Sequence, residues 1–210
     1  MNLHDLFSTA RKLWELFGPS PFGVVTDLWM LLCLYWLISS LQRKVSIKRE
    51  PWLQRLRHLI PMSAAVFLLF HRNLYLGWLE KRFVPQLLSI EMAGVAIAAA
   101  GIALAMWARW HLGMNWSSAV AIHEKHELIR TGPYRFMRHP IYSGILMGFA
   151  GTALVRGEVS GIAGFGIALI AFYCKARKEE SYLTQEFGLR FAEHLKQTGM
   201  FLPVFMKQKY

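Results

Sequence analysis

Long apolar runs separated by charged stretches dominate this chain, and they predict an all-α integral membrane protein with about five transmembrane helices. Residues 22–41 form the first run, which carries only Asp27 and is long enough to cross a bilayer as a helix. Residues 92–108 contain no charged side chain, and the residues on either side can lengthen that helix. These two runs give the first and third predicted spans.

Three further apolar segments complete the predicted membrane part. Residues 141–155 and 159–174 are uncharged and are separated only by Arg156-Gly157-Glu158, which predicts a tight helical hairpin. Both are short, so polar flanks or local thinning of the bilayer must make up the thickness. Residues 59–70 are shorter still and contain Pro61, which would kink the helix. We assign the second span to them because the topology needs a crossing there.

The N-terminal segment differs from the membrane spans. Residues 1–17 place apolar side chains at helical spacing with charged residues between them, which predicts an amphipathic helix on the membrane surface. Gly18-Pro19-Ser20-Pro21 ends this helix. The chain therefore divides into an interfacial helix, residues 1–21; the first two spans with their loops, residues 22–90; and a core, residues 91–210, with spans three to five, a loop at 109–140 and C-terminal helices at 175–198.

Composition supports a membrane protein and excludes other classes. Hydrophobic residues make up 54% of the chain and charged residues 18%, where about 25% charged is usual in soluble domains. A disordered chain, a coiled coil and an ordinary soluble domain are therefore excluded. The net charge of +11 is better explained by a membrane than by nucleic acid. Cys33 and Cys174 support neither a disulfide framework nor a zinc site, and we expect no metal.

The distribution of positive charge predicts the orientation. About three quarters of the 24 Lys and Arg residues fall on one side of the layout, in residues 43–58, in residues 109–138 and in the tail after span five. The positive-inside rule makes this side cytoplasmic, with the N-terminus outside and the C-terminus in the cytoplasm, and we expect a prokaryotic inner membrane. The loop before span four and the tail then face one compartment, and the hairpin of spans four and five brings them together.

The start of span four is the first candidate site. Pro140 fits the first turn of a helix and pushes His139 out of helical geometry, so residues 138–142 form the N-terminal cap of the span. Backbone N–H groups and the positive end of the helix dipole lie there beside Arg138, an arrangement that suits a carboxylate or a phosphate. The alternative interpretation is that the arginines set topology or contact lipid headgroups, and that Tyr142 anchors the interface.

The second candidate site follows span five. Glu179 and Glu180 are adjacent carboxylates, and Leu183 and Phe187 follow at a spacing of four, which predicts that the helix continues into the cytoplasm. The alternative here is an amphipathic surface helix whose charges are only solvated.

These stretches together resemble the isoprenylcysteine carboxyl methyltransferase family, which shares its C-terminal core with the phospholipid N-methyltransferases. The resemblance covers roughly residues 90–205. Arg-His-Pro-x-Tyr followed downstream by Glu-Glu-x(6)-Phe-Gly is its most specific part. The residues that carry it are Leu112-Gly113, Trp116-Ser117, His126, Leu128, Gly132-Pro133-Tyr134, Arg138-His139-Pro140, Tyr142, Gly144, Glu179-Glu180, Phe187-Gly188 and Pro203.

The resemblance implies a membrane enzyme that uses S-adenosylmethionine, held on the cytoplasmic side. We add Arg138 to the implied cofactor residues because it lies at the cap, and Glu179 because it precedes Glu180. The catalytic candidates are Tyr142, Glu180 and Arg177. Arg177 is the arginine nearest to the position of the family's substrate arginine, and an alternative alignment places Ala176 at that position. The full cofactor set is His126, Glu127, Leu128, Ile129, Tyr134, Arg138, His139, Pro140, Ile141, Tyr142, Glu179 and Glu180.

The chemistry of the cofactor fits these residues. Its carboxylate suits the cap at Arg138 and His139, and its ammonium or sulfonium suits Glu180. The partners we expect are membrane lipids and a lipophilic or prenylated acceptor that enters from the bilayer; a carboxylate acceptor needs no general base. The alternatives are a phospholipid amine or a thiol as acceptor, a sterol-type reductase that binds NADPH through residues such as Arg135 and Lys178, and a membrane protein without activity.

Overall fold

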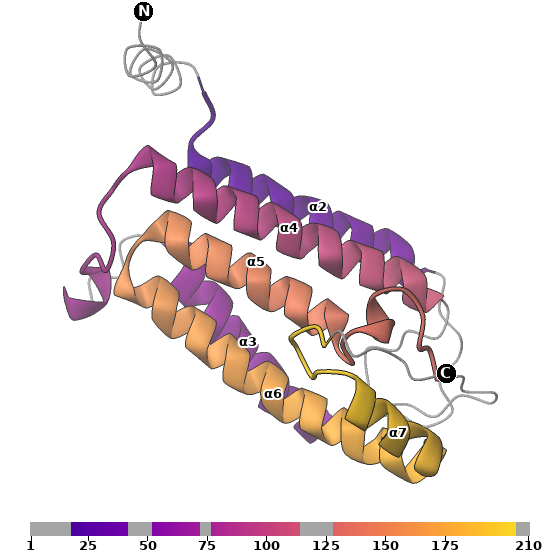
Figure 1. The fold of residues 1–210 in the computed structure, drawn as a ribbon. Coiled ribbons are helices and arrows are strands. Elements are labelled where there is room, and N and C mark those ends of the chain that lie inside the picture. Colours follow the sequence, from indigo (N-terminus) through magenta and orange to yellow (C-terminus); the bar gives the residue numbers. More distant parts are fainter. Residues whose placement is uncertain (1–17, 42–51, 72–76, 114–127, 205–210) are drawn as a thin grey trace, which may run out of the picture.

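The computed structural model describes residues 18–41, 52–71, 77–113 and 128–204, and in these ranges the regular elements are all helices (Figure 1). Among the described residues, the strand-like pairings are limited to two isolated β-bridges. The predicted all-α fold is therefore confirmed for this part of the chain. The elements are α2 Pro21–Ser40, α3 Trp52–Phe70, η1 Gly77–Glu80, α4 Leu88–Leu112, η3 Gly132–Arg135, α5 Pro140–Arg156, α6 Val159–Phe187 and α7 Leu189–Gln197.

The long helices α2 to α6 form the body of the described part of the chain, and α5 lies at its centre (Figure 1). Helices α4 and α6 pack along α5, while α2 packs on α4 and α3 packs on α6. We call the end at which α5 begins the site end, and the opposite end, where α5 turns into α6, the far end. Helix α7 folds back beside the last part of α6 at the site end (Figure 1).

Glycines allow α4 and α5 to approach closely. A Cβ added to Gly101 would lie 2.5 Å from the carbonyl oxygen of Gly144, and one added to Gly94 would lie 2.8 Å from the carbonyl oxygen of Gly151. Small residues at such positions let helix backbones pack against each other in a membrane, where van der Waals contact drives association. This packing fixes the start of α5 against the last turns of α4.

The turn at the far end is as tight as the sequence predicts. Gly157 ends α5 in the left-handed conformation with φ of 68°, which glycine adopts without strain. Arg156 is buried there and bonds Glu158, Ser160 Oγ and the carbonyl oxygen of Leu69 at the end of α3. One arginine thus joins the far ends of α3, α5 and α6.

Length and apolarity mark three helices as able to cross a membrane: α2, α4 and α6. Helix α5 has 17 residues, and the apolar part of α3 is the shorter helix Leu56–Phe70. The chain is an integral membrane protein, and a total of five spans stays a prediction. The predicted interfacial helix at residues 1–17 lies outside the described residues. The division of the chain into three parts, with boundaries after residues 21 and 90, also stays a prediction.

Candidate functional site

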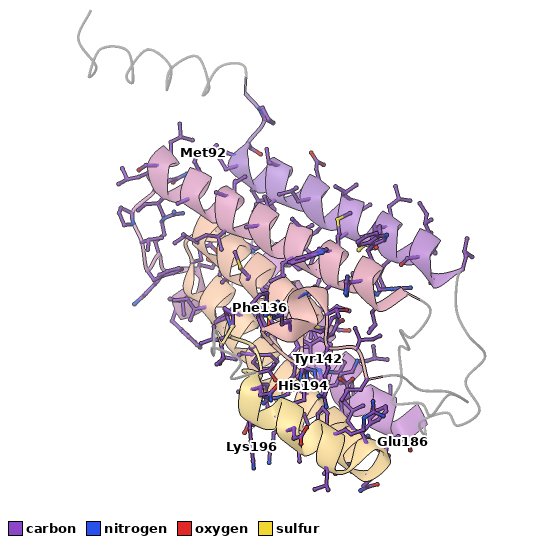
Figure 2. The ribbon with its side chains drawn as sticks, turned by 45° about the vertical axis from the view of Figure 1, so that its right-hand side comes forward. Met92, Phe136, Tyr142, Glu186, His194 and Lys196 are labelled. Carbon is purple, nitrogen blue, oxygen red and sulfur yellow. The ribbon has the colours of Figure 1, made fainter. Side chains whose placement is uncertain are left out.

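The N-terminus of α5 has the predicted geometry. Pro140 occupies the first turn, and His139 precedes it with φ of −123° and ψ of 58°, outside the helical region. Helix α6 continues without a break from the membrane part to Phe187, so Glu179 and Glu180 lie on a rigid helix beside α5. Figure 2 shows Tyr142 and His194 at this site end and Met92 at the opposite end.

Arg138 joins three helices at the site end. Its Nε lies 2.6 Å from Glu180 Oε1 on α6; the Glu180 side chain is buried and that of Arg138 is 11% exposed. Its Nη1 donates to the carbonyl oxygens of Thr198 and Leu195, at the C-terminal end of α7. Hydrogen bonds in which both partners are charged are among the strongest that a protein makes. Arg138 therefore holds α6 and α7 against the start of α5.

The ring of His139 lies between the two glutamates. Its Nδ1 is 3.6 Å from Glu179 Oε2, and its Nε2 is 3.4 Å from Glu180 Oε1. The ring also stacks on Tyr142, with 5.3 Å between the centroids and only 4° between the planes. The imidazole is therefore held in place on both edges and on one face.

The two adjacent glutamates have different surroundings. The side chain of Glu180 is 6% exposed. Burial acts to raise its pKa, but hydrogen bonds from His139 and Arg138 and their charges outweigh burial and keep the pKa below its ordinary value. The side chain of Glu179 is 24% exposed and accepts a hydrogen bond of 2.5 Å from the hydroxyl of Tyr142. Glu180 is thus an ionised structural partner, and Glu179 keeps an open face.

The Tyr142 ring connects this polar cluster to the apolar part of the bundle. Phe172 of α6 packs against the ring with centroids 4.8 Å apart, and the Lys175 Nζ lies 5.5 Å from the ring centroid. Tyr142 therefore has its hydroxyl among carboxylates and its ring against apolar side chains.

Residues 198–204 cover the start of α5. The N–H groups of Arg138 and His139 donate to the carbonyl oxygens of Gly199 and Met200 at 2.9 and 3.1 Å. Ser143 Oγ donates to the carbonyl oxygen of Phe201 at 2.7 Å. The sequence predicts a cap whose N–H groups are open to a ligand. In the structure, the carbonyl oxygens of Gly199 and Met200 already accept hydrogen bonds from two of these groups.

The remaining predicted residues lie around this cluster. Tyr134 and Ile141 are buried together against Ala108, and Ile129 packs against them. Burial raises the pKa of the Tyr134 hydroxyl, and the charge of Glu179 raises it further. Arg177 is exposed, with its Nη1 3.8 Å from Glu180 Oε2. Pro140 is buried in the first turn of α5 and Leu128 is half-buried, while His126 and Glu127 lie outside the described residues.

Comparisons with known proteins support one family. Residues 90–190 match the family model described as phospholipid methyltransferase. A probable protein-S-isoprenylcysteine O-methyltransferase of Oryza sativa subsp. indica is 34% identical over 94 residues, which cover 43% of this chain and 49% of the relative. The protein-S-isoprenylcysteine O-methyltransferase of Dictyostelium discoideum is 29% identical over 131 residues, 60% of this chain and 55% of the relative. These matches support the resemblance to the isoprenylcysteine carboxyl methyltransferase family.

The fold agrees with this family. A solved structure titled as the eukaryotic intramembrane Ras methyltransferase ICMT (isoprenylcysteine carboxyl methyltransferase) aligns with a TM-score of 0.59 at 19% identity. The alignment covers 90% of this chain and 70% of that chain, and it shows a shared fold. The chain spans about half the length of the curated relatives it matches. Residues 134–142 and the Glu179-Glu180 pair lie inside the range that matches the family model.

Sequence reasoning missed His194, which lies beside this polar cluster on α7. His194 is buried on α7, and its pKa falls to about 4 because of burial and the charges of Arg130, Arg138 and His139. The sequence signal that could have found His194 is its position three residues after Phe191, because residues three apart lie on the same face of a helix. Arg109, which the sequence analysis counts only among topogenic charges, is also buried.

Proposed function

We propose that this protein is an S-adenosylmethionine-dependent methyltransferase that methylates the carboxylate of a lipophilic acceptor at the membrane. The observation that carries the proposal is the convergence of His139, Tyr142, Glu179 and Glu180 at one end of a helical bundle. All four lie within the part of the chain that matches the family model. The relatives from Oryza sativa and Dictyostelium discoideum are named as methyltransferases.

Glu179 fits a cofactor that carries an ammonium and a sulfonium, because its partly open carboxylate can face a cationic group. When bound, S-adenosylmethionine supplies an electrophilic methyl group: a C–O bond forms to the acceptor, the C–S bond breaks, and the electron pair stays on sulfur. His139, Tyr134 and the residues before η3 complete the proposed cofactor set.

The residues of the chain contribute position rather than proton transfer. A carboxylate is already the nucleophilic form, so this reaction needs no general base. Hydrogen bonds from Arg138 and Tyr142 fix Glu180 and Glu179, respectively. The carboxylate of Glu180 lies 3.4 Å from His139 Nε2 and so faces one edge of that ring. Because His139 and Glu180 are buried, this arrangement lies in a site with little water, where orientation and desolvation both accelerate transfer.

The proposed acceptor is a lipid-modified molecule that presents a carboxylate, of the prenylated type that the relatives' names describe. Tyr142 supports this choice because its ring packs on Phe172 at the apolar side while its hydroxyl lies in the polar cluster. An acceptor with an apolar tail can reach such a boundary from the bilayer. Arg177, exposed beside Glu180, remains our candidate for contact with the acceptor.

We further propose that the site end faces the cytoplasm, with the N-terminus outside, in a prokaryotic inner membrane. The charge distribution supports this orientation, since most Lys and Arg residues lie in the segments between spans on that side. A reporter fused after Tyr210 should give a cytoplasmic signal. A signal from the opposite compartment would reverse the orientation.

A phospholipid amine is the second candidate acceptor, because the matching family model is described as phospholipid methyltransferase. The reductase alternative loses support because Arg138, one of the arginines it needs for the NADPH phosphate, is bonded to Glu180 and to two carbonyl oxygens.

Methyl transfer from labelled S-adenosylmethionine tests the proposal and separates the acceptors. Purified protein in lipid nanodiscs receives a prenylcysteine with a free carboxylate or, in a parallel reaction, a phosphatidylethanolamine. Alkali releases methanol from a methyl ester but not from a methylated amine or thioether. We expect alkali-labile label on the prenylcysteine. Alkali-stable label on the amine would select the second candidate, and transfer to neither acceptor would contradict both.

A further inference from the structure

Arg109 is a buried arginine in the last turn of α4, at the site end. Only 3% of its surface is exposed. Removing a guanidinium from water is costly unless hydrogen bonds compensate for the lost hydration. Arg109 makes such bonds with backbone carbonyl oxygens: its Nη2 donates to Ser39 at 2.7 Å and its Nη1 donates to Gly113 at 2.9 Å.

These two carbonyl oxygens belong to the ends of two different helices. Ser39 lies in the last turn of α2, and Gly113 ends α4. The C-terminus of a helix carries unpaired carbonyl oxygens and the negative end of the helix dipole, so a cation there is favourable. The planar fork of arginine can serve both helix ends at once, which the single ammonium of lysine does less well.

The same turn of α4 holds the segment that carries Tyr134. Ala108, next to Arg109, is fully buried against Tyr134 and Ile141. In the same last turn, His111 Nε2 lies 2.8 Å from Thr131 Oγ1, and the carbonyl oxygen of Thr131 accepts from the N–H of Tyr134. The position of η3 therefore depends on the last turn of α4.

The hydroxyl of Tyr134 is sensitive to charges from α4 and from α6. The positive charge of Arg109 and the negative charge of Glu179 act on its pKa in opposite directions. The Tyr134 ring packs with Ala108 of α4 and Ile141 of α5.

We propose that Arg109 is a positioning residue for the cofactor site, which joins the end of α2 to Tyr134 through the last turn of α4. The inference rests on the proposed function for its effect on cofactor binding. It also predicts that Arg109 protects the backbone amides of residues 128–137 from hydrogen exchange, and this consequence does not depend on any cofactor.

Arg156 provides a matched control at the opposite end of the bundle. It is also buried and also donates to the carbonyl oxygen at a helix end, that of Leu69. The test compares Arg109→Gln, Arg109→Lys and Arg156→Gln with the parent protein in detergent. Calorimetry measures affinity for S-adenosylmethionine, and hydrogen exchange measures the protection of the amides of residues 128–137.

We expect Arg109→Gln to weaken cofactor affinity at least tenfold and to speed exchange in residues 128–137. Arg109→Lys should fall between this variant and the parent, and it carries the test if Arg109→Gln does not fold. Arg156→Gln should lower the melting temperature but leave both readouts within twofold of the parent. Parental affinity and exchange in a folded Arg109→Gln, or equal losses in Arg156→Gln, would overturn the inference.

The two proposals fail in different ways. A parent protein that binds no S-adenosylmethionine contradicts the proposed function. In that case faster exchange of residues 128–137 in Arg109→Gln alone still supports the positioning role, and unchanged exchange overturns it.

Discussion

The hydroxyl of Tyr142 donates a 2.5 Å hydrogen bond to Glu179 Oε1, which ties the first turn of α5 to the part of α6 beyond its apolar run. The other oxygen of Glu179 faces the Nδ1 of His139 at 3.6 Å. Tyr142 thus controls the direction of the one carboxylate in the cluster that keeps an open face. Glu180, the neighbouring carboxylate, is occupied by Arg138 and His139.

Removing the Tyr142 hydroxyl should affect binding more than folding. Tyr142→Phe keeps the ring contacts with His139 and Phe172 but leaves Glu179 without this donor. We expect about a fivefold to tenfold loss of S-adenosylmethionine affinity, or about 1 to 1.4 kcal/mol, with a melting temperature within a few degrees of the parent. Calorimetry and thermal unfolding measure the two effects. Parental affinity would show that the direction of Glu179 does not matter for the cofactor.

The two glutamates should respond differently to neutralisation. Glu180→Gln removes the buried charge that pairs with Arg138, so we expect at least a tenfold loss of cofactor affinity together with a clear fall in melting temperature. Glu179→Gln should also reduce cofactor affinity, but with a much smaller fall in melting temperature. Equal melting temperatures for the two variants would contradict the structural role that we assign to Glu180.

His194 should make the fold sensitive to mild acid. Its pKa is about 4 in the folded protein, so between this value and its ordinary value of 6.5 the unfolded chain binds more protons. The contribution of His194 to the free energy of unfolding is complete above pH 6.5 and is lost as the pH falls towards 4. Thermal unfolding from pH 7 to pH 5 should therefore show a smaller decline for His194→Gln than for the parent.

Glu180 titrates in a lower range and can be separated from His194. Its pKa lies below its ordinary value of 4.5, so the stability it contributes is lost only as pH falls below that value. An identical decline of parent and His194→Gln between pH 7 and pH 5 would show that His194 is not the group responsible.

Close packing of α4 and α5 predicts an unusual effect of alanine. Alanine is more favourable than glycine inside a helix by roughly 1 kcal/mol. At Gly101, however, the new Cβ would lie 2.5 Å from backbone atoms of Gly144 and Gly148, so we expect Gly101→Ala to lower the melting temperature by several degrees. Gly166 on α6 has no atom within 4 Å of an added Cβ, and Gly166→Ala should be neutral or stabilising. A Gly101→Ala variant as stable as Gly166→Ala would contradict the helix packing.

The sequence predicts the parts of this structure that depend on local rules. Pro140 begins α5 and His139 leaves helical geometry, because proline restricts both itself and the residue before it. Gly157 closes the hairpin, and the spacing after Glu180 predicts that α6 continues beyond the membrane part. These signals lie within a few residues of the features they predict.

The contacts that connect distant segments could not be predicted in the same way. Arg138 and Glu180 are 42 residues apart, and the sequence predicts that they bind different groups of the cofactor, whereas the two side chains bond each other. The cover over the cap comes from residues 199–201, which no local pattern directs to that place. The burial of Arg109 depends on the approach of α2, whose end is 70 residues away in sequence.

Cofactor binding tests the central claim most directly. Purified protein in detergent is titrated with S-adenosylmethionine and, separately, with NADPH by calorimetry, together with His139→Ala. We predict saturable binding of S-adenosylmethionine by the parent and affinity at least tenfold weaker, by about 1.4 kcal/mol, in His139→Ala. Tight binding of NADPH without measurable binding of S-adenosylmethionine would contradict the account.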